Sequence, residues 1–552
     1  MAAAEAAPAT FNFADIWEAV AARVPERTAL VCGTERRTYA SLADRVNQLA
    51  RHLTSAGLGA GDHLGICMPN RVEWVEAMLA AFTVRAVPVN LNHRYRAAEL
   101  VELLGRDGAR GLVFDASTEA EIAAVVAALD VPVRLRAGEP PSAGAIDAVS
   151  LEDAVGAQPP DPLEVPGRSG DDHYVMYTGG TTGMPKGVVW RQEDAYFACI
   201  GGGDPTRTQG AVERPGQLLD RLTDGFSYLP VAPLMHAAAQ WTTLSWLFAG
   251  GQTTLMPGPL DPEAVWQAVD DEAVNMMTVI GDAVGRPLLD AWDDAPGRWQ
   301  APSLFAISNG GAPMSPALKA RIAATFPDKV LVDGFGSSET GAQGSQRLQP
   351  GDEGRAGGLA RFTPYANTSV LDDDLRPVEP GSGVAGRVAL RGRVPVGYHN
   401  DPERTASTFV DIGGRRHVLT GDLATVEADG TIQLLGRGSQ CINTGGEKVF
   451  PEEVEAALHG HPAVADVLVV GVADERWGSA VTAVVAPVPG AEPSLEELRE
   501  HCRIDLAGYK LPKHLVLVDA VRRSPAGKAD YRWAAAVAEE RATGVNRTGM
   551  AS

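Results

Sequence analysis

A stretch rich in glycine and threonine, with one lysine, holds the residues best suited to bind phosphate. It reads YVMYTGGTTGMPKGVVW over residues 174–190. Glycines allow positive φ and close backbone approach. Backbone N–H groups, threonine hydroxyls and a lysine ammonium are the donors that a polyphosphate needs. The sequence therefore predicts a phosphate-binding loop whose members are Thr178, Gly179, Gly180, Thr181, Thr182, Gly183 and Lys186.

This loop differs from the nucleotide-binding P-loop, which reads G-x-x-x-x-G-K-[ST] and leads into a helix. Lys186 instead lies between Pro185 and Gly187, and an apolar, strand-like segment follows it. We expect two short strands, Tyr174–Tyr177 and Gly187–Trp190, joined by the loop. Taken alone, the same residues are also compatible with a glycine-rich hairpin loop that carries an unrelated lysine.

Three further segments place polar residues beside small ones. They are Asp333–Gly341 (DGFGSSETG), Ser308–Pro313 (SNGGAP) and Pro233–His236 (PLMH), the last followed by three alanines. Glycine and alanine next to a polar group leave room for a substrate. Each segment also has a structural interpretation: a glycine turn before a helix, a turn at a strand end, and a close helix–sheet contact beside a structural histidine.

The elements that must position these segments alternate between strands and helices. Such alternation predicts a mostly parallel sheet covered by helices. From Val370 to Gly436 short strands and turns dominate, and Gly438 to about Ala542 has its own pattern of helices and strands. Hydrophobic periodicity predicts helices at Phe11–Arg23, Ser41–Ala56, Arg71–Phe82, Ala237–Ala249, Pro451–His459 and Ser494–Leu506, and strands at Ala29–Cys32, His63–Met68, Ala86–Asn90, Val464–Val472, Ala480–Pro487 and His514–Val518.

Together, the phosphate loop, the DGFGSSETG segment and Ser524–Ala529 (SPAGKA) resemble motifs of the adenylate-forming superfamily. This superfamily includes acyl-CoA synthetases, adenylation domains of peptide synthetases and luciferases. Six such motifs occur in the family's order between Tyr174 and Lys528. The resemblance implies an α/β fold with a large N-terminal domain of mostly parallel sheets with helices plus a small β-rich part, residues 1–437. It also implies a small, mobile α+β C-terminal domain, residues 438–552, with a disordered tail.

The resemblance also implies how ATP is bound. The loop and Lys186 hold the β- and γ-phosphates, Phe335 stacks on adenine, Ser338 contacts the α-phosphate and Glu339 holds Mg²⁺. Gly179 and Phe335 stand where the family usually has Ser and Tyr; each departure removes a hydroxyl but keeps the backbone donors or the stacking face. The remaining ATP-site residues implied are Gly311, Ala312, Pro313, Asp333, Gly334, Gly336, Asp422 at the ribose hydroxyls and Arg437 at ribose or phosphate.

The acyl substrate and the C-terminal domain receive roles from the same resemblance. His236 borders the carboxylate, and Ala238, Gly310 and Gly336 line the acyl site. The hinge is Ser439, a small polar residue that can still act as a hinge, where the family usually has the charged Asp or Lys. The implied adenylation lysine is Lys528, which bridges the carboxylate and the α-phosphate. The pantetheine tunnel is formed by Gly445 and Gly446.

The function implied is an AMP-forming acid–thiol ligase that uses ATP, Mg²⁺ and CoA. Among the branches of the superfamily, TGGTTGMPKGVVW and CINTGGEKVFPEEVE most resemble acyl-CoA synthetases for fatty and bulky alicyclic acids. We therefore expect a long-chain fatty, steroid-type or diterpenoid-type acid as substrate. Two alternatives are an acyl-AMP ligase that loads a carrier protein and a catalytically inactive ligand-binding relative.

The composition limits partners and compartment. The 552 residues are 45% hydrophobic and 21% charged, as in soluble proteins of more than one domain. A formal net charge of −22 disfavours nucleic acid and anionic membranes. The chain shows no signal-peptide pattern, no membrane-length apolar run, and no metal-ligand spacing among its five cysteines. We expect a cytoplasmic protein with reduced thiols, and a homodimer remains open.

Overall fold

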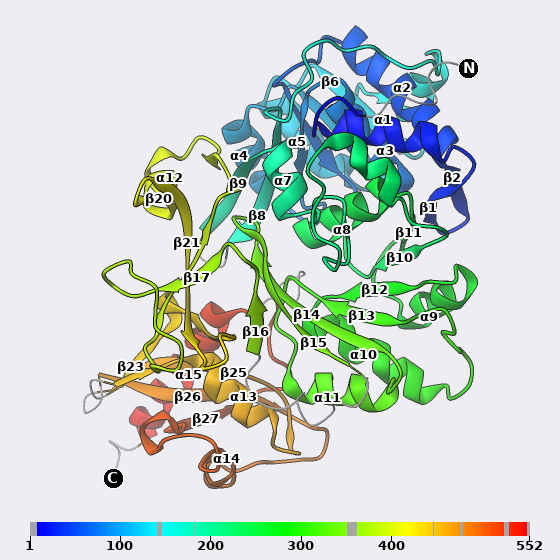
Figure 1. The fold of residues 1–552 in the computed structure, drawn as a ribbon. Helices are drawn as coiled ribbons and strands as arrows, with labels where there is room; N and C mark the ends of the chain where they lie inside the picture. Colours follow the sequence, from blue (N-terminus) through cyan, green and yellow to red (C-terminus); the bar gives the residue numbers. More distant parts are fainter. Residues whose placement is uncertain are drawn as a thin grey trace.

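Two large β-sheets form the N-terminal part of the protein, and a smaller sheet forms the C-terminal part (Figure 1). The structure, a computed structural model, describes residues 8–140, 146–180, 183–349, 361–444, 447–474, 478–523 and 529–548. The large sheets have 14 and eight strands. Both contain a run of parallel strands. Antiparallel strands extend one edge of the eight-stranded sheet and both edges of the 14-stranded sheet. The predicted α/β organisation is confirmed.

The eight-stranded sheet has the order β19–β9–β8–β4–β3–β5–β6–β7. Its parallel strands are buried along most of their length because helices pack on the sheet. The strands are β3 (His63–Cys67), β4 (Val87–Asn90), β5 (Gly111–Asp115), β6 (Val133–Ala137), β7 (Val149–Ser150), β8 (His173–Gly180), β9 (Gly183–Arg191) and β19 (Gly397–Tyr398), and the helices between them are α3 (Val72–Thr83), α4 (Ala97–Asp107), α5 (Glu119–Ala128), α6 (Leu151–Gly156) and, after β9, α7 (Gln192–Ala198).

The 14-stranded sheet has the order β17–β18–β21–β22–β16–β15–β14–β13–β12–β10–β11–β1–β2, and β20 pairs with β21. Its parallel part runs from β14 to β1. The strands are β1 (Thr28–Cys32), β2 (Glu35–Thr38), β10 (Ser227–Pro230), β11 (Gln252–Leu255), β12 (Met276–Val279), β13 (Ala306–Asn309), β14 (Val330–Ser337), β15 (Gly341–Leu348), β16 (Arg361–Pro364), β17 (Thr368–Leu371), β18 (Gly386–Arg391), β20 (Phe409–Ile412), β21 (Arg415–Val426) and β22 (Ile432–Arg437); the helices are α8 (Ala237–Phe248), α9 (Pro262–Asp271), α10 (Gly281–Asp294), α11 (Pro316–Thr325) and α12 (Pro402–Thr408).

An aromatic cluster joins the two large sheets. Phe13 of α1 (Phe13–Arg23) lies with its ring centroid 5.1 Å from that of Phe82 on α3 and 5.5 Å from that of Phe248 on α8. Tyr174 of β8 contacts the same ring at 5.9 Å. Edge-to-face contacts of this kind stabilise a core beyond the area they bury. The cluster therefore fixes α8 relative to β8, which carries the predicted phosphate loop.

The C-terminal part contains the sheet β25–β26–β27, with helices packed on both of its faces. Val467 and Val469 pack with α13 residues, whereas Leu468 and Val470 pack with Ala534 and Ala538 of the last helix. The sequence does not predict that helix, which runs from Tyr531 to Thr548. The elements are β23 (Ile442–Thr444), β24 (Glu447–Val449), α13 (Pro451–His459), β25 (Val464–Asp474), β26 (Gly478–Pro487), α14 (Leu495–Cys502), β27 (His514–Leu517) and α15 (Tyr531–Thr548).

Candidate active site

The predicted phosphate loop connects two antiparallel strands, β8 and β9. Both strands reach further into the loop than the sequence predicts, because Thr178 pairs with Lys186 across the ladder. The register shifts between Thr178 and Gly180, as at a β-bulge, and bulges often lie next to active sites. Thr181 and Thr182, which we predict to bind phosphate, lie outside the described residues.

The DGFGSSETG segment is a β-hairpin, not a turn before a helix. Its strands are β14 and β15, and the turn places Glu339 at its tip. A Cβ on Gly336 would lie 2.0 Å from the carbonyl oxygen of Gly341, and a Cβ on Gly341 would lie 2.6 Å from that of Ala198. The backbone N–H of Ser337 donates to the Thr340 hydroxyl at 2.9 Å. The small residues therefore permit the close backbone approach that this turn requires.

Three residues from separate segments converge beside this turn. The hydroxyl of Tyr398 donates to Oε1 of Glu339 at 2.9 Å, and Nζ of Lys186 lies 5.3 Å from the centroid of the Tyr398 ring. Tyr398 belongs to β19 and pairs with Val188 of β9. Burial, followed by the charge of Glu339, raises the pKa of Tyr398 well above its usual range. The hydroxyl thus stays protonated and orients the carboxylate that we predict to hold Mg²⁺.

Tyr398 is a residue that sequence analysis misses. It lies far along the chain from Lys186 and Glu339, and no motif marks it. A second link supports the same turn, since Nε1 of Trp190 donates to the carbonyl oxygen of Ser338 at 3.0 Å. Strand β9 therefore positions Lys186 itself and, through Trp190 and β19, the turn that carries Ser338 and Glu339.

The adenine side of the predicted site is built around Asn309, at the end of β13. Its side-chain amide donates to Oδ1 of Asp333 at 2.7 Å and to the carbonyl oxygen of Ala312 at 3.0 Å. Nζ of Lys319 lies 2.5 Å from Oδ2 of Asp333, and both side chains are buried. Asp333 thus bonds within the protein through both oxygens. Sequence analysis misses Asn309 and Lys319, which hold the Gly310–Pro313 turn against β14.

The remaining residues predicted to contact adenine lie on β14. Phe335 is half-buried, and its ring lies 4.8 Å from that of Phe362 at an interplanar angle of 56°. Gly334 and Gly336 flank it on the strand. The Phe335 ring therefore packs against an aromatic neighbour, which restricts the orientations of the ring on which we predict adenine to stack.

The predicted acyl-site residues come together where α8 meets the turn after β13. Gly311 has φ +86°, and a Cβ there would lie 3.8 Å from Cβ of Ala238 and 3.6 Å from Cδ1 of Ile280. His236 is the N-cap residue of α8, and Ala238 is only partly buried, whereas Ala239 is buried in the core. Ala238 thus lies at the predicted acyl site, whereas Ala239 packs the helix against the core.

Asn90, at the carboxyl end of β4, links the acyl side to the phosphate loop. Its amide nitrogen donates to the carbonyl oxygens of Met235 at 2.6 Å and Tyr177 at 2.9 Å. Its oxygen accepts from the backbone N–H of Tyr177 at 2.7 Å. Met235 precedes His236, and Tyr177 precedes Thr178. Sequence analysis misses Asn90, although a polar residue at the carboxyl end of a parallel strand is a usable signal.

The predicted ribose-binding pair is brought together by β21 and β22. Asp422 and Arg437 are direct partners in the antiparallel ladder. The Thr420 hydroxyl donates to Oδ2 of Asp422 at 2.6 Å. The predicted hinge residue Ser439 follows in a 3₁₀ turn, Gly438–Gln440. The predicted C-terminal site residues Gly445, Gly446 and Lys528 lie outside the described residues.

Comparisons with known proteins match the chain along nearly its whole length. The model of the family described as AMP-binding enzyme matches residues 17–398, and that of the AMP-binding enzyme C-terminal domain matches residues 453–528. A medium/long-chain-fatty-acid–CoA/3-oxocholest-4-en-26-oate–CoA ligase of Mycobacterium marinum is 42% identical over 96% of this chain and 97% of its own. A 3-oxocholest-4-en-26-oate–CoA ligase of Rhodococcus rhodochrous is 41% identical, over 95% of each chain.

A solved structure shares the fold. The anthranilate CoA ligase AuaEII, in complex with anthranoyl-AMP, matches with a TM-score of 0.83 at 22% identity, over 98% of this chain and 100% of that one. At this identity the likeness concerns the fold alone. It agrees with the arrangement of two large sheets followed by a small C-terminal sheet.

Proposed function

Because the chain belongs to the AMP-binding enzyme family, we propose that it is an ATP-dependent acyl-CoA synthetase for large apolar carboxylic acids. The observation that carries the proposal is the 42% identity, over 96% of the chain, with a ligase named for fatty acids and a cholestenoate. The convergence of Lys186, Tyr398 and Glu339 supports it. The products are the acyl-CoA thioester, AMP and pyrophosphate.

The proposed reaction solves a leaving-group problem in two steps. A carboxylate cannot expel oxide, so a carboxylate oxygen first attacks the α-phosphorus of ATP and displaces pyrophosphate. The CoA thiolate then attacks the acyl carbon, and AMP leaves with the oxygen that linked it. The first step needs positioning and stabilisation of charge on phosphate. Thr178–Gly183 and Lys186 hold the β- and γ-phosphates, and Ser338 contacts the α-phosphate.

Mg²⁺ fits the Glu339 site on chemical grounds. Mg²⁺ is commonly bound by one or two carboxylates together with substrate phosphate oxygens. Glu339 offers one carboxylate, and Tyr398 bonds only one of its two oxygens. We propose that Glu339 holds the ion, which neutralises charge on the phosphates. Tyr398 keeps the carboxylate in place.

The acid is proposed to enter between α8 and the turn at Gly310–Gly311, with its carboxylate near His236. Ala238 and Gly311 approach each other closely there, and neither carries a bulky side chain that would fill the proposed acyl site. The names of the two relatives include a steroid acid, and one name also includes medium- and long-chain fatty acids. We therefore propose a steroid-type or long-chain fatty acid, with a diterpenoid acid as a related possibility.

The C-terminal part is proposed to serve both steps in two poses. Residues 1–437 form the large domain, and residues 438–552 rotate about Ser439. Lys528 acts in the adenylation pose, where its ammonium bridges the carboxylate and the α-phosphate. In the other pose Gly445 and Gly446 line the path of the pantetheine thiol. A motion of this kind is a common way to complete a site for one step and open it for the next.

A cytoplasmic location is proposed from the thiols. None of the five cysteines, all of which lie in the described part of the chain, forms a disulfide bond, and burial raises the pKa of both Cys32 and Cys67 to about 12. Such thiols are stable in a reducing compartment. Among the described residues, no helix combines the length and the apolar character needed to cross a membrane.

A panel of acids tests the proposal. Pyrophosphate release should depend on the acid, be largest for steroid-type or long-chain acids, and yield a thioester when CoA is added. If acyl-AMP accumulates and only a carrier protein captures it, the protein is an acyl-AMP ligase instead. If no acid supports pyrophosphate release, the ligand-binding alternative is correct.

A further inference from the structure

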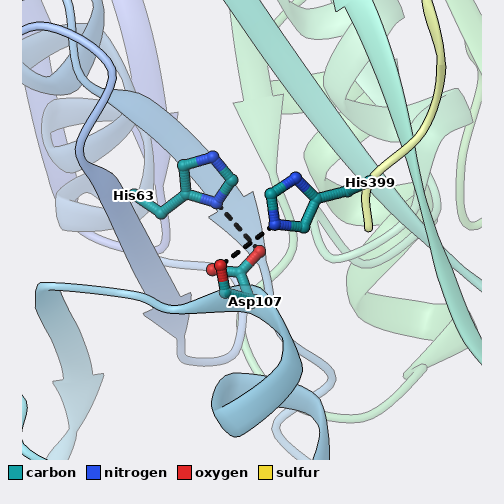
Figure 2. Close-up of side chains that lie close together, drawn as sticks. All are labelled: His63, Asp107 and His399. Atoms are coloured by element: carbon teal, nitrogen blue, oxygen red, sulfur yellow. Dashed lines mark hydrogen bonds and ion pairs between the residues drawn. The ribbon is translucent and has the colours of Figure 1, made fainter. Parts of the chain in front are cut away.

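Two imidazoles and a carboxylate form a cluster separate from the predicted catalytic residues. Figure 2 shows His63, Asp107 and His399 directed toward one another from β3, the end of α4 and the residue after β19. One ligand atom from each lies within 4.8 Å of the other two. The rings of His63 and His399 are 4.7 Å apart between centroids. Residues this distant in sequence meet only because the fold brings them together.

The carboxylate at the centre of the cluster is buried and incompletely bonded. Oδ1 of Asp107 lies 2.9 Å from Nδ1 of His63 and accepts from the Tyr177 hydroxyl at 2.9 Å. Oδ2 has no hydrogen-bond partner in the described part of the chain, and the side chain is 0% exposed. A buried carboxylate oxygen without a partner is costly and calls for a water or an ion beside it.

His399 is held in place before any ion binds. Its backbone N–H donates to the carbonyl oxygen of Gly187 at 2.7 Å, and its Nε2 lies 3.0 Å from the carbonyl oxygen of Asp107. The side-chain amide of Asn400 donates to the carbonyl oxygen of Arg106 at 2.9 Å. The segment after β19 is therefore already docked on the end of α4, which lowers the ordering cost of a shared ligand.

The donor set selects a class of ion. Two imidazole nitrogens and a carboxylate are ligands of Zn²⁺ and related transition metals, at about 2.0–2.2 Å from the ion. Mg²⁺ and Ca²⁺ prefer an all-oxygen set. The three ligand atoms already lie within 4.8 Å of one another, and the proton shared by His63 and Asp107 is released when the ion binds.

We propose that His63, Asp107 and His399 form a transition-metal site of the Zn²⁺ class that fastens the β19 segment to α4. The site is distinct from the Mg²⁺ position at Glu339 but shares its supports. Tyr398 precedes His399, and a Cβ on Gly187, the neighbour of Lys186, would lie 3.2 Å from Cβ of His399. An ion at this site thus stabilises the segment that orients Glu339.

Titration of the full-length, chelator-treated protein with ZnCl₂, in competition with a chromophoric chelator, tests the site. The parent should bind one tight equivalent. The variants His63→Gln, His399→Gln and Asp107→Asn should each lower the affinity for Zn²⁺ by about 100-fold or more. Loss of a group that only hydrogen-bonds to a metal ligand already lowers metal affinity by about 10–100-fold. The matched control is His461→Gln, which breaks a second close histidine pair among the described residues, His461 and His501, whose rings are 5.2 Å apart.

The control should bind Zn²⁺ like the parent. The proposal is wrong if the parent binds no Zn²⁺ ion tightly. It is also wrong if both His63→Gln and His399→Gln still bind one Zn²⁺ ion tightly. Melting curves without metal show whether each variant folds. With Zn²⁺, the melting temperature should rise in the parent and in His461→Gln but not in His63→Gln or His399→Gln. Binding of Co²⁺ gives a second readout through its visible absorption spectrum. We expect visible bands of bound Co²⁺ but no thiolate-to-metal charge-transfer band. A charge-transfer band would instead show that cysteine binds the ion.

Discussion

The hydroxyl of Tyr398 donates a 2.9 Å hydrogen bond to Oε1 of Glu339, and the face of the same ring lies 5.3 Å from Nζ of Lys186. One side chain thus contacts both the carboxylate predicted to bind Mg²⁺ and the lysine predicted to bind phosphate. It reaches them from β19, a two-residue strand at the edge of the eight-stranded sheet.

Tyr398→Phe removes the hydroxyl but keeps the ring beside Lys186. Because hydrogen bonds to charged groups are worth more than neutral ones, we expect the Mg²⁺ concentration for half-maximal pyrophosphate release to rise about 10-fold or more. The apparent affinity for the acid should change little. Tyr509→Phe, at a side chain that is 40% exposed, is the control. An unchanged Mg²⁺ dependence in Tyr398→Phe would show that the Tyr398 hydroxyl does not position Glu339.

Ala238→Phe should narrow the proposed acyl site. A Cβ on Gly311 would lie 3.8 Å from Cβ of Ala238, so a phenyl ring at position 238 would crowd the turn and the proposed acyl site beside it. Overpacking typically costs about 1–3 kcal/mol, so kcat/KM for a steroid-type acid should fall about 10-fold or more. Short acids should lose much less. Equal losses for short and ring-bearing acids would show that Ala238 only packs the helix.

Lys319→Met should destabilise the protein through Asp333. Both partners are buried, with side chains 3% and 7% exposed, so the variant leaves an uncompensated charge. Such a loss costs about 3–5 kcal/mol, and the melting temperature should fall clearly. Adding Asp333→Asn should recover part of the loss. Lys329→Met breaks an ion pair with the exposed Asp328, and its cost should be about 0–1 kcal/mol. Equal effects of Lys319→Met and Lys329→Met would contradict the buried-pair account.

Glu455 predicts a pH dependence of stability. Burial, followed by the charge of Glu452, raises the pKa of Glu455 from 4.5 to about 8. Between these values the folded protein keeps a proton that the unfolded chain releases, so stability falls as pH rises through this window. Glu455→Gln keeps a neutral side chain beside Tyr531. We expect its melting temperature to fall less between pH 5 and pH 8 than that of the parent; parallel curves would refute the assignment.

The sequence predicts the fold class because strand and helix periods alternate over most of the chain. It also marks the segments that the structure brings together at the candidate site, because these segments combine glycine turns with polar residues. The sequence does not predict the roles of Tyr398, Asn90 and Lys319, because each contacts a partner that lies near it only after the strands have paired. The run Val467–Val470, buried on both faces, is a signal for a second covering helix that sequence analysis does not use.

Attack of the carboxylate on the α-phosphorus of ATP is tested by following one oxygen atom. The acid is labelled with ¹⁸O in its carboxyl group and supplied with ATP, Mg²⁺ and CoA, and the products are analysed by mass spectrometry. The proposed reaction transfers one ¹⁸O to AMP, because the acyl carbon–oxygen bond breaks when the thiol attacks. Label in inorganic phosphate with formation of ADP, or thioester formed without label in AMP, would contradict it.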